Sequence, residues 1–143
     1  MALDDLQTHQ LAQIIAQATA PSFLLGAVSG FVAVLMGRMN GVIDRIRVIN
    51  AIADDDARGH LKTDLPRLKR RAKLLNDAIY LAVGAAICTT LLVILAFASA
   101  LLGLHHEPGA AVMFVLALAL MCAALVTLAR EVRMALTDYD HVG

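Results

Sequence analysis

Three apolar segments without ionisable side chains constrain this chain more than any other feature. They cover residues 18–36, 78–102 and 110–129, and none contains Asp, Glu, Lys, Arg or His. A helix needs about 20 apolar residues to cross a hydrocarbon core about 30 Å thick, so each segment is long enough. A chain of 143 residues cannot bury three such helices in a core of its own. The sequence therefore predicts an all-α integral membrane protein with three transmembrane helices.

The composition agrees with this prediction. Hydrophobic residues make up 59% of the chain and charged residues 17%, whereas a soluble domain has about 45–50% and about 25%. The size fits one folding unit, so residues 1–143 are expected to form a single membrane domain. The first residues contain neither a basic region nor a convincing cleavage site, and we expect no cleaved signal peptide.

The basic residues predict the orientation. All 12 Lys and Arg lie in residues 38–73 and 130–133, so the segment after the first span and the tail carry them all. The N-terminus and the short loop at 103–109 carry none. Basic loops stay in the cytoplasm, which predicts an outer N-terminus and a cytoplasmic C-terminus. Basic residues placed between spans, and alternating with acids, argue against nucleic-acid binding.

Residues 38–76 are expected to form a cytoplasmic antiparallel helical hairpin. Apolar residues recur at helical spacing in both arms, and the run of acids at 54–56 with Gly59 separates them. The second arm is expected to begin near Thr63 or Asp64, with Pro66 in its first turn. The residues of the two apolar stripes are Val42, Ile43, Ile46, Ile49 and Ile52 in the first arm, and Leu65, Leu68, Ala72, Leu75 and Ile79 in the second.

Small residues form a ladder along one face of the first span. Ala18, Ser22, Gly26 and Gly30 recur every four residues, and a further pair, Gly37 and Gly41, follows. Small side chains let membrane helices approach closely. The ladder is a subunit interface, a surface that packs against the chain's own second and third helices, or a chance pair in a span rich in Gly and Ala.

Pro21 predicts a kink near the outer end of the first span. Upstream, Gln13 and Gln17 lie on one side of a helical pattern. We favour an amphipathic helix that lies on the membrane surface and turns inward near Pro21, where water can solvate the amides. The alternative is one long helix whose Gln13–Gln17–Pro21 stripe lines a wet vestibule.

Asp44 lies in a polar stretch where the first span enters the hairpin. It is expected to pair with Arg70 or Arg71 of the opposing arm, or more weakly with Arg47 three residues along its own helix. The basic run at 67–73 anchors the second span and can attract anionic lipid head groups.

Asp77 is the acid closest to the hydrocarbon of the second span. A carboxylate there should seek a basic partner, for which Arg38 or Arg45 is the candidate. The alternative to structural pairing is a role in ion entry or gating. The whole predicted cytoplasmic polar cluster comprises Arg38, Asp44, Arg45, Arg47, Arg70, Arg71, Asn76 and Asp77.

Several short motifs resemble those of a known family. They are the run at 20–25, Asp44-Arg45-x-Arg47, Arg70-Arg71-Ala72 with Asn76 and Ile79, and Arg130-Glu131. Together they resemble a bacterial family of small three-span membrane proteins, the domain of unknown function 2721, over about 11–136. The resemblance implies an inner-membrane location and transfers no activity or catalytic residue.

No catalytic, cofactor-binding or metal site is predicted. Ser, His and acidic residues form no catalytic pattern, and His105 and His106 on a loop, with His9 and Glu107, lack ligand geometry. We therefore predict a non-enzymatic membrane component that binds itself or another membrane protein. The alternative is a homo-oligomeric channel lined by Gln13, Gln17, Ser22 or Thr89. Such a channel requires several copies of the chain, because three spans are too few to enclose a path alone.

Overall fold

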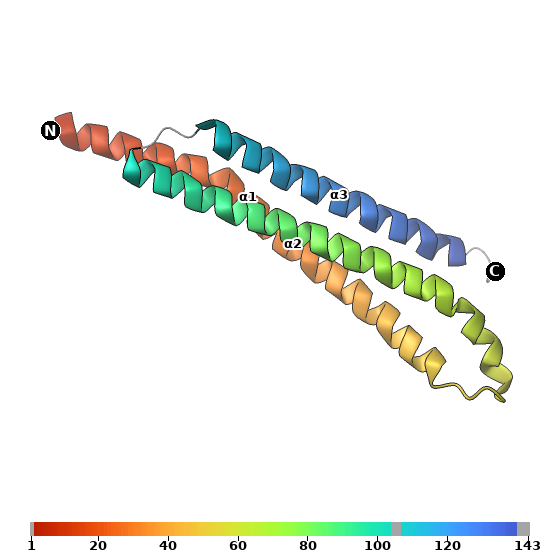
Figure 1. Ribbon diagram of the computed structural model, residues 1–143. Helices are drawn as coiled ribbons and strands as arrows, with labels where there is room; N and C mark the ends of the chain where they lie inside the picture. The colour runs from red at the N-terminus through yellow and green to blue at the C-terminus, as the bar shows by residue number, and fades with distance from the viewer. Residues whose placement is uncertain (1, 104–106, 140–143) are drawn as a thin grey trace.

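The computed structural model describes residues 2–103 and 107–139, and the side chains of 8–103 and 108–137. Its elements are the helix α1 (Ala2–Asn50), the short 3₁₀ helix η1 (Ala57–Asp64), and the helices α2 (Leu65–Leu102) and α3 (Glu107–Tyr139). The three long helices are extended rods, of which α2 packs along both α1 and α3, and α1 and α3 run opposite to α2 (Figure 1). The prediction of an all-α fold is confirmed.

The helix α1 is continuous across Pro21, with 49 residues between Ala2 and Asn50. The preferred prediction, a separate surface helix that turns near Pro21, is therefore wrong, and the alternative of one long helix holds. A proline in a helix interior removes one backbone hydrogen bond, while the helical bonds on either side can continue. Gln13 and Gln17 are exposed and Pro21 is buried. The predicted kink at Pro21 stays a prediction.

The helix α2 packs against both neighbours and lies at the centre of the apolar core. On α1, the buried residues Val28, Leu35, Val42 and Ile49 recur every seven residues, the spacing that keeps one seam of a helix against a partner. They belong to one cluster with buried residues of α2 and with Ala124 of α3. The α2 members are Leu68, Leu75, Ala78, Ala82 and Ala85.

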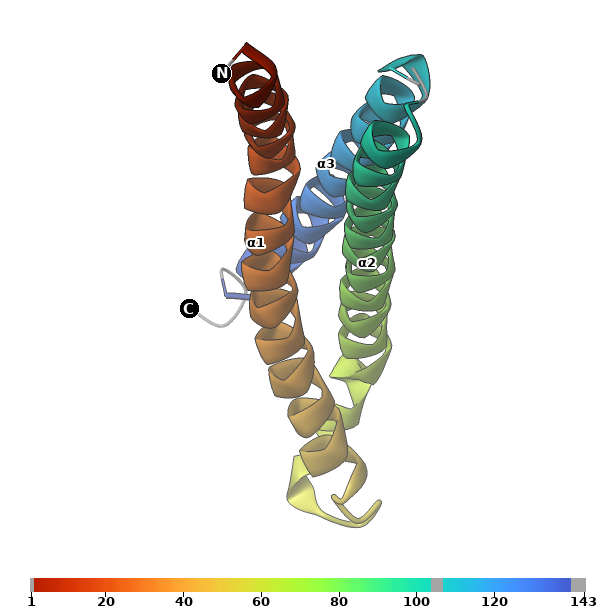
Figure 2. The ribbon, with the colours of Figure 1, turned by 90° about the vertical axis from the view of Figure 1, so that its left-hand side faces the viewer.

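The three helices do not form an even bundle. In Figure 2 the N-terminal part of α1 stands apart from the connected ends of α2 and α3, whereas α1 and α2 approach each other further along. The helix α2 contacts both α1 and α3 extensively, whereas α1 and α3 make few contacts with each other. The N-terminal half of α1 therefore has less support from the rest of the chain than its C-terminal half.

The connection between α1 and α2 differs in part from the prediction. The helix α1 ends at Asn50, before the acidic run, and η1 follows, which was not predicted. Asp64 is the N-cap residue of α2 and Pro66 lies in the first turn, as predicted, although the Asp64 side chain makes no capping hydrogen bond. Both predicted apolar stripes contribute to the core: Val42, Ile49, Leu68 and Leu75 are buried in it, and Ile46, Leu65, Ala72 and Ile79 pack against it.

The helix α2 ends at Gly103, a position whose backbone conformation favours glycine. Gly103 has a φ of +63° and donates its amide hydrogen bond to the carbonyl of Ser99. This left-handed conformation is common after the last turn of a helix and is easily adopted only by glycine. Pro108 lies in the first turn of α3.

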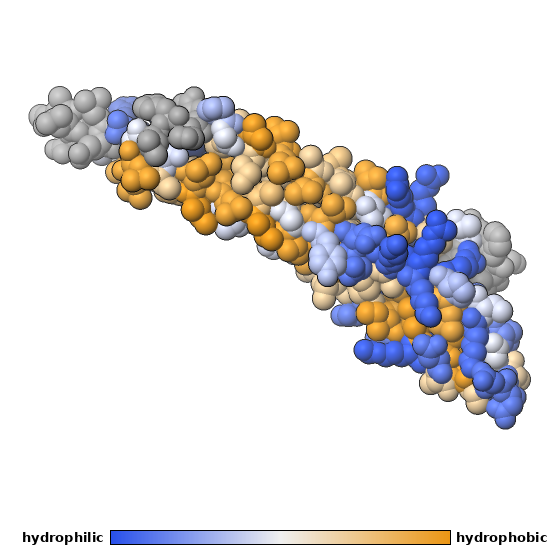
Figure 3. All heavy atoms as spheres, viewed as in Figure 1, coloured by the Kyte–Doolittle hydropathy of each residue, from blue (hydrophilic) through white to orange (hydrophobic). Residues whose placement is uncertain are grey.

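All three long helices are long and apolar enough to cross a membrane. Much of their apolar surface points outward: Phe23 is 77% exposed, Leu101 87% and Val112 68%. Figure 3 shows this apolar surface over the middle of the molecule, with hydrophilic residues gathered at one end. Such a surface is stable in lipid and not in water. The chain has the features of a multi-pass membrane protein.

Candidate functional site

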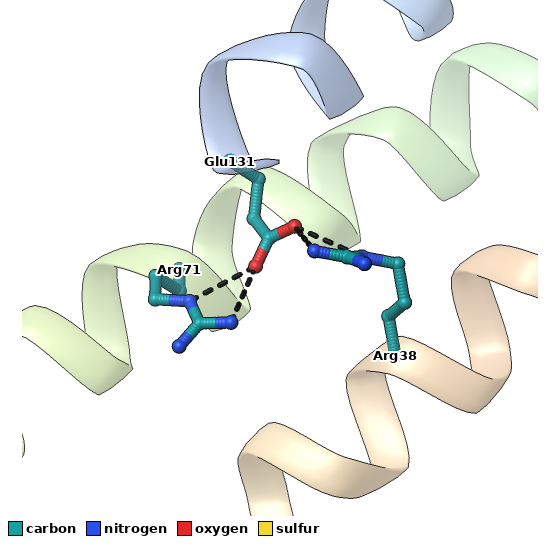
Figure 4. A network of polar contacts seen from close by, with 3 residues as sticks. All are labelled: Arg38, Arg71 and Glu131. Atoms are coloured by element: carbon teal, nitrogen blue, oxygen red, sulfur yellow. Dashed lines mark hydrogen bonds and ion pairs between the residues drawn. The ribbon is translucent and has the colours of Figure 1, made fainter. Parts of the chain in front are cut away.

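Two arginines and one glutamate meet where the three long helices approach the hydrophilic end. Arg38 of α1 and Glu131 of α3 each come two residues after an apolar segment, and Arg71 of α2 comes before one. Because α1 and α3 run opposite to α2, the three positions lie at the same level of the molecule (Figures 1 and 4). We call these three residues the ion triad.

Each arginine of the ion triad holds one oxygen of the glutamate. Arg38 donates from Nε and Nη2 to Oε2 of Glu131, over 3.0 and 2.6 Å. Arg71 approaches Oε1 with Nε and Nη2, both at 2.9 Å. The two guanidinium groups therefore hold the carboxylate from opposite sides (Figure 4). Hydrogen bonds between charged groups at these lengths are stronger than neutral ones.

Burial makes the ion triad energetically important. The side chain of Glu131 is fully buried, whereas those of Arg38 and Arg71 are 35% and 19% exposed. A carboxylate away from water is stable only when basic groups and hydrogen bonds replace its hydration. The ion triad links α3 to α1, two helices that otherwise make few contacts. It also leaves one net positive charge, since two guanidinium groups face one carboxylate.

The structure corrects two predicted pairings. Asp44 pairs with Arg47 over 3.3 Å, the weak alternative on its own helix, and not with Arg70 or Arg71. Both side chains are mostly exposed, at 68% and 76%, so water screens this pair. Arg71 instead binds Glu131, which lies on α3, outside the two arms of the predicted hairpin.

Asp77 does not pair with Arg38, which binds Glu131 instead. Asp77 and Asn76 are exposed on α2, and no ion pair of Asp77 occurs among the described residues. Arg45 and Arg70 are exposed as well. Of the predicted polar cluster, the structure thus brings Arg38 and Arg71 together, through a glutamate that sequence reasoning did not include as a site residue.

A sequence signal for Glu131 existed. It is the first acid after the third apolar segment, and Arg130 and Arg133 lie on either side of it. The other charged residues of this stretch are basic and anchor the span, so an acid among them suggests a specific ion pair. Its partners lie 93 and 60 residues away along the chain, so helical periodicity gives no means of identifying them.

The glycines of α1 face away from the rest of the chain. A Cβ built on Gly26, Gly30, Gly37 or Gly41 would have no atom of another part of the described chain within 4 Å. We call these four residues the open glycine face. By contrast, a Cβ on Gly84 of α2 would lie 3.6 Å from Cδ1 of Leu120.

The other members of the predicted small-residue ladder also lie away from the core. Ala18 is half-buried and Ser22 is exposed. The Ser22 hydroxyl donates to the carbonyl of Ala18 over 2.8 Å, so its own helix satisfies it. Gly26 and Gly30 thus do not pack against α2 or α3, so the ladder is either a surface for another molecule or a chance pair.

The linker between α1 and α2 contains two local ion pairs. Arg58 binds Asp56 through its guanidinium group at 2.8 Å, and its backbone amide donates to the same carboxylate at 2.9 Å. Side-chain and then backbone hydrogen bonds from Arg58 lower the pKa of Asp56 from 3.8 to about 2. Lys62 bonds to Asp54 and lowers the pKa of that carboxyl too. Both pairs stabilise the ionised linker.

A metal site has no support in the part of the chain that the structure describes. Those residues contain no group of three or more His, Cys, Asp or Glu that would suit a metal ion. His105 and His106 lie outside the described residues, as does the side chain of Glu107.

Comparison with known proteins identifies a family and no activity. The model of one family, described as a protein of unknown function (DUF2721), matches residues 18–141. The matched region contains the ion triad and the open glycine face. No curated protein and no solved structure matches the chain.

Proposed function

The chain belongs to this family of unknown function, and we propose that it is a non-enzymatic component of the bacterial inner membrane that associates with a second copy of itself. The open glycine face carries this proposal. A continuous helix presents Gly26 and Gly30 one turn apart, with no part of the described chain over them. Glycines spaced by four residues let two membrane helices bring their backbones close together, which replaces the missing hydrophobic drive in lipid.

The proposed orientation places the N-terminus outside and the C-terminus in the cytoplasm. Its support is the distribution of charge, since all 12 basic residues lie in 38–73 and 130–133, and Figure 3 shows hydrophilic residues gathered at one end of the molecule. A cytoplasmic hairpin would then consist of the end of α1, η1 and the start of α2. Single cysteines at Thr8 and Thr137, in a chain with Cys88→Ala and Cys122→Ala, test this with a membrane-impermeant maleimide.

Self-association is tested by the mass of the purified protein in nanodiscs. The test compares the wild type with Gly26→Leu, Gly30→Leu. A matched control is Ala119→Leu, Ala123→Leu, which adds the same bulk with the same spacing to exposed positions of α3. The proposal expects an oligomer that the glycine variant dissociates and the control retains. A monomeric wild type, or an oligomer that survives both changes, would overturn it.

A homo-oligomeric channel is the alternative assembly. Its path would need Gln13, Gln17 or Ser22, which are exposed on α1. Thr89 is fully buried and donates its hydroxyl to the carbonyl of Ala85 over 2.7 Å, so it suits a helix contact better than a pore lining. A ring of several copies that conducts ions in planar bilayers, with conductance altered by Gln17→Leu, would favour the channel over a sealed dimer.

A further inference from the structure

We propose that the ion triad is a binding site for the phosphate of an anionic phospholipid, in the leaflet that meets the basic ends of the three helices. The first argument is charge. Two guanidinium groups share one carboxylate, so one positive charge remains on side chains that are only 35% and 19% exposed. A charge partly removed from water is stabilised by an anion of opposite sign.

The second argument is the number of hydrogen-bond donors. An arginine has five N–H groups and no acceptor. Arg38 and Arg71 both use Nε and Nη2 on Glu131. Neither Nη1 has an assigned acceptor within the described part of the chain. The two Nη1 atoms alone therefore offer four N–H donors to an external ligand, and phosphate oxygens match the geometry of a guanidinium group.

The third argument is position. Arg38 lies two residues beyond one apolar segment and Glu131 two residues beyond another, so the ion triad is at the depth where hydrocarbon gives way to head groups. Figure 3 shows hydrophilic side chains directly beside the apolar surface. A phospholipid places its phosphate at this depth and its acyl chains against the apolar surface of the helices.

The fourth argument selects an anionic lipid over a zwitterionic one. The stretches 38–45, 67–77 and 130–133 together carry nine basic and three acidic residues. Exposed basic residues such as Arg70, Arg130 and Arg133 make the potential around the ion triad positive. Such a field attracts lipids with a net negative charge in preference to those whose charges cancel.

The experiment measures lipid binding by native mass spectrometry of the full chain in a mild detergent. The probes are phosphatidylglycerol and phosphatidylcholine with identical acyl chains. Arg38→Gln removes the surplus charge and leaves a neutral Arg71–Glu131 pair. Arg133→Gln is the matched control, since it removes one exposed charge without contact to Glu131. Arg38→Lys keeps the charge and loses the planar group.

The proposal expects Arg38→Gln to weaken phosphatidylglycerol binding at least about twentyfold and Arg133→Gln by about fivefold or less, because an exposed charge contributes only through the field. Arg38→Lys should fall between them. Equal, small losses in both Gln variants would overturn the proposal, since they would show diffuse attraction alone.

The wild type provides a test that does not depend on the folding of any variant. It should bind phosphatidylglycerol in preference to phosphatidylcholine, and a lack of preference would overturn the proposal. Inorganic phosphate separates the two sources of the ligand. Phosphate that competes with the lipid supports recognition of phosphate oxygens on a lipid. Phosphate that binds alone, while the lipid does not bind, would overturn the lipid assignment.

Discussion

Two faces of α1 differ in both residues and surroundings. The face toward α2 carries large branched side chains every seven residues, from Val28 to Ile49, and all are at most 5% exposed. The opposite side of α1 is the open glycine face. A Cβ at any of its four glycines would have no atom of another described part of the chain within 4 Å. Both faces are apolar, so burial of apolar surface does not distinguish them in lipid. Side-chain volume does, because branched residues fill a fixed intrachain contact and glycines leave the backbone accessible.

The largest expected effect comes from removing the carboxylate of the ion triad, which lies among the contacts of α1 with the rest of the chain. Glu131→Gln leaves Arg38 and Arg71 without their carboxylate and should lower the free energy of unfolding by about 3–5 kcal/mol. Titration with sodium dodecyl sulfate in bicelles, followed by circular dichroism, measures the change. Asp44→Asn is the control, because it breaks an exposed pair that contributes about 0–1 kcal/mol.

A triple variant sharpens this result. Arg38→Met, Arg71→Met, Glu131→Leu replaces all three charges with apolar groups and should recover most of the stability, since no charge is left unpaired. A triple variant as unstable as Glu131→Gln would contradict the assignment of the loss to unpaired buried charge.

The second effect compares neighbours on the two sides of α1. Ile49 is 1% exposed and Val48 is 62% exposed. Ile49→Ala should destabilise the protein by about 2–5 kcal/mol through a cavity against α2. Val48→Ala should change stability by no more than about 0.5 kcal/mol. The same detergent titration measures both, and equal losses would mean that the seven-residue seam does not hold α1.

The third effect compares a covered glycine with an open one. Gly84→Leu places a side chain against Leu120, which lies 3.6 Å from a Cβ at that position, and overpacking there should cost about 1–3 kcal/mol. Gly26→Leu meets no atom of another part of the described chain. Its effect should be confined to self-association, so a monomeric preparation at high dilution should retain its stability. A large loss in that monomer would contradict an open face.

The smallest effect lies outside both faces, in the linker. The pKa of Asp56 is about 2 in the folded protein, whereas an Asp side chain without partners has a pKa of 3.8. A lowered folded-state pKa means that the ionised carboxylate stabilises the linker above pH 3.8, and that this contribution is lost as the pH falls from 3.8 through about 2. The carboxyl carbon shift of Asp56 by NMR should titrate near 2, and a midpoint near 3.8 would exclude the pairing with Arg58.

The sequence allowed prediction of the helices better than of their contacts. The apolar segments and the position of Pro66 follow from local residue types, which is why the structure contains three long apolar helices and the predicted start of α2. The stripes that contain Val42 and Leu68 follow from helical periodicity. These features depend on residues close together in the chain.

The ion triad could not be predicted in this way, because it depends on the rotation of three helices about their axes. The predicted partners were Arg38 or Arg45 for Asp77 and Arg70, Arg71 or Arg47 for Asp44, all of which lie on the first two long helices. The third helix supplies Glu131, which meets both arginines. The continuity of α1 was only the less favoured alternative, although one lost hydrogen bond at Pro21 counts for little among those of a helix with 49 residues.

The length of α1 has a mechanical consequence. At a rise of 1.5 Å per residue, its 49 residues span about 74 Å, more than twice a hydrocarbon thickness of about 30 Å. Such a helix acts as a lever with its pivot in the bilayer. A change in tilt of about 10° around the midpoint moves each end by about 6 Å in opposite directions. A displacement of the N-terminal end therefore moves the C-terminal end of α1, which leads into the linker, in the opposite direction.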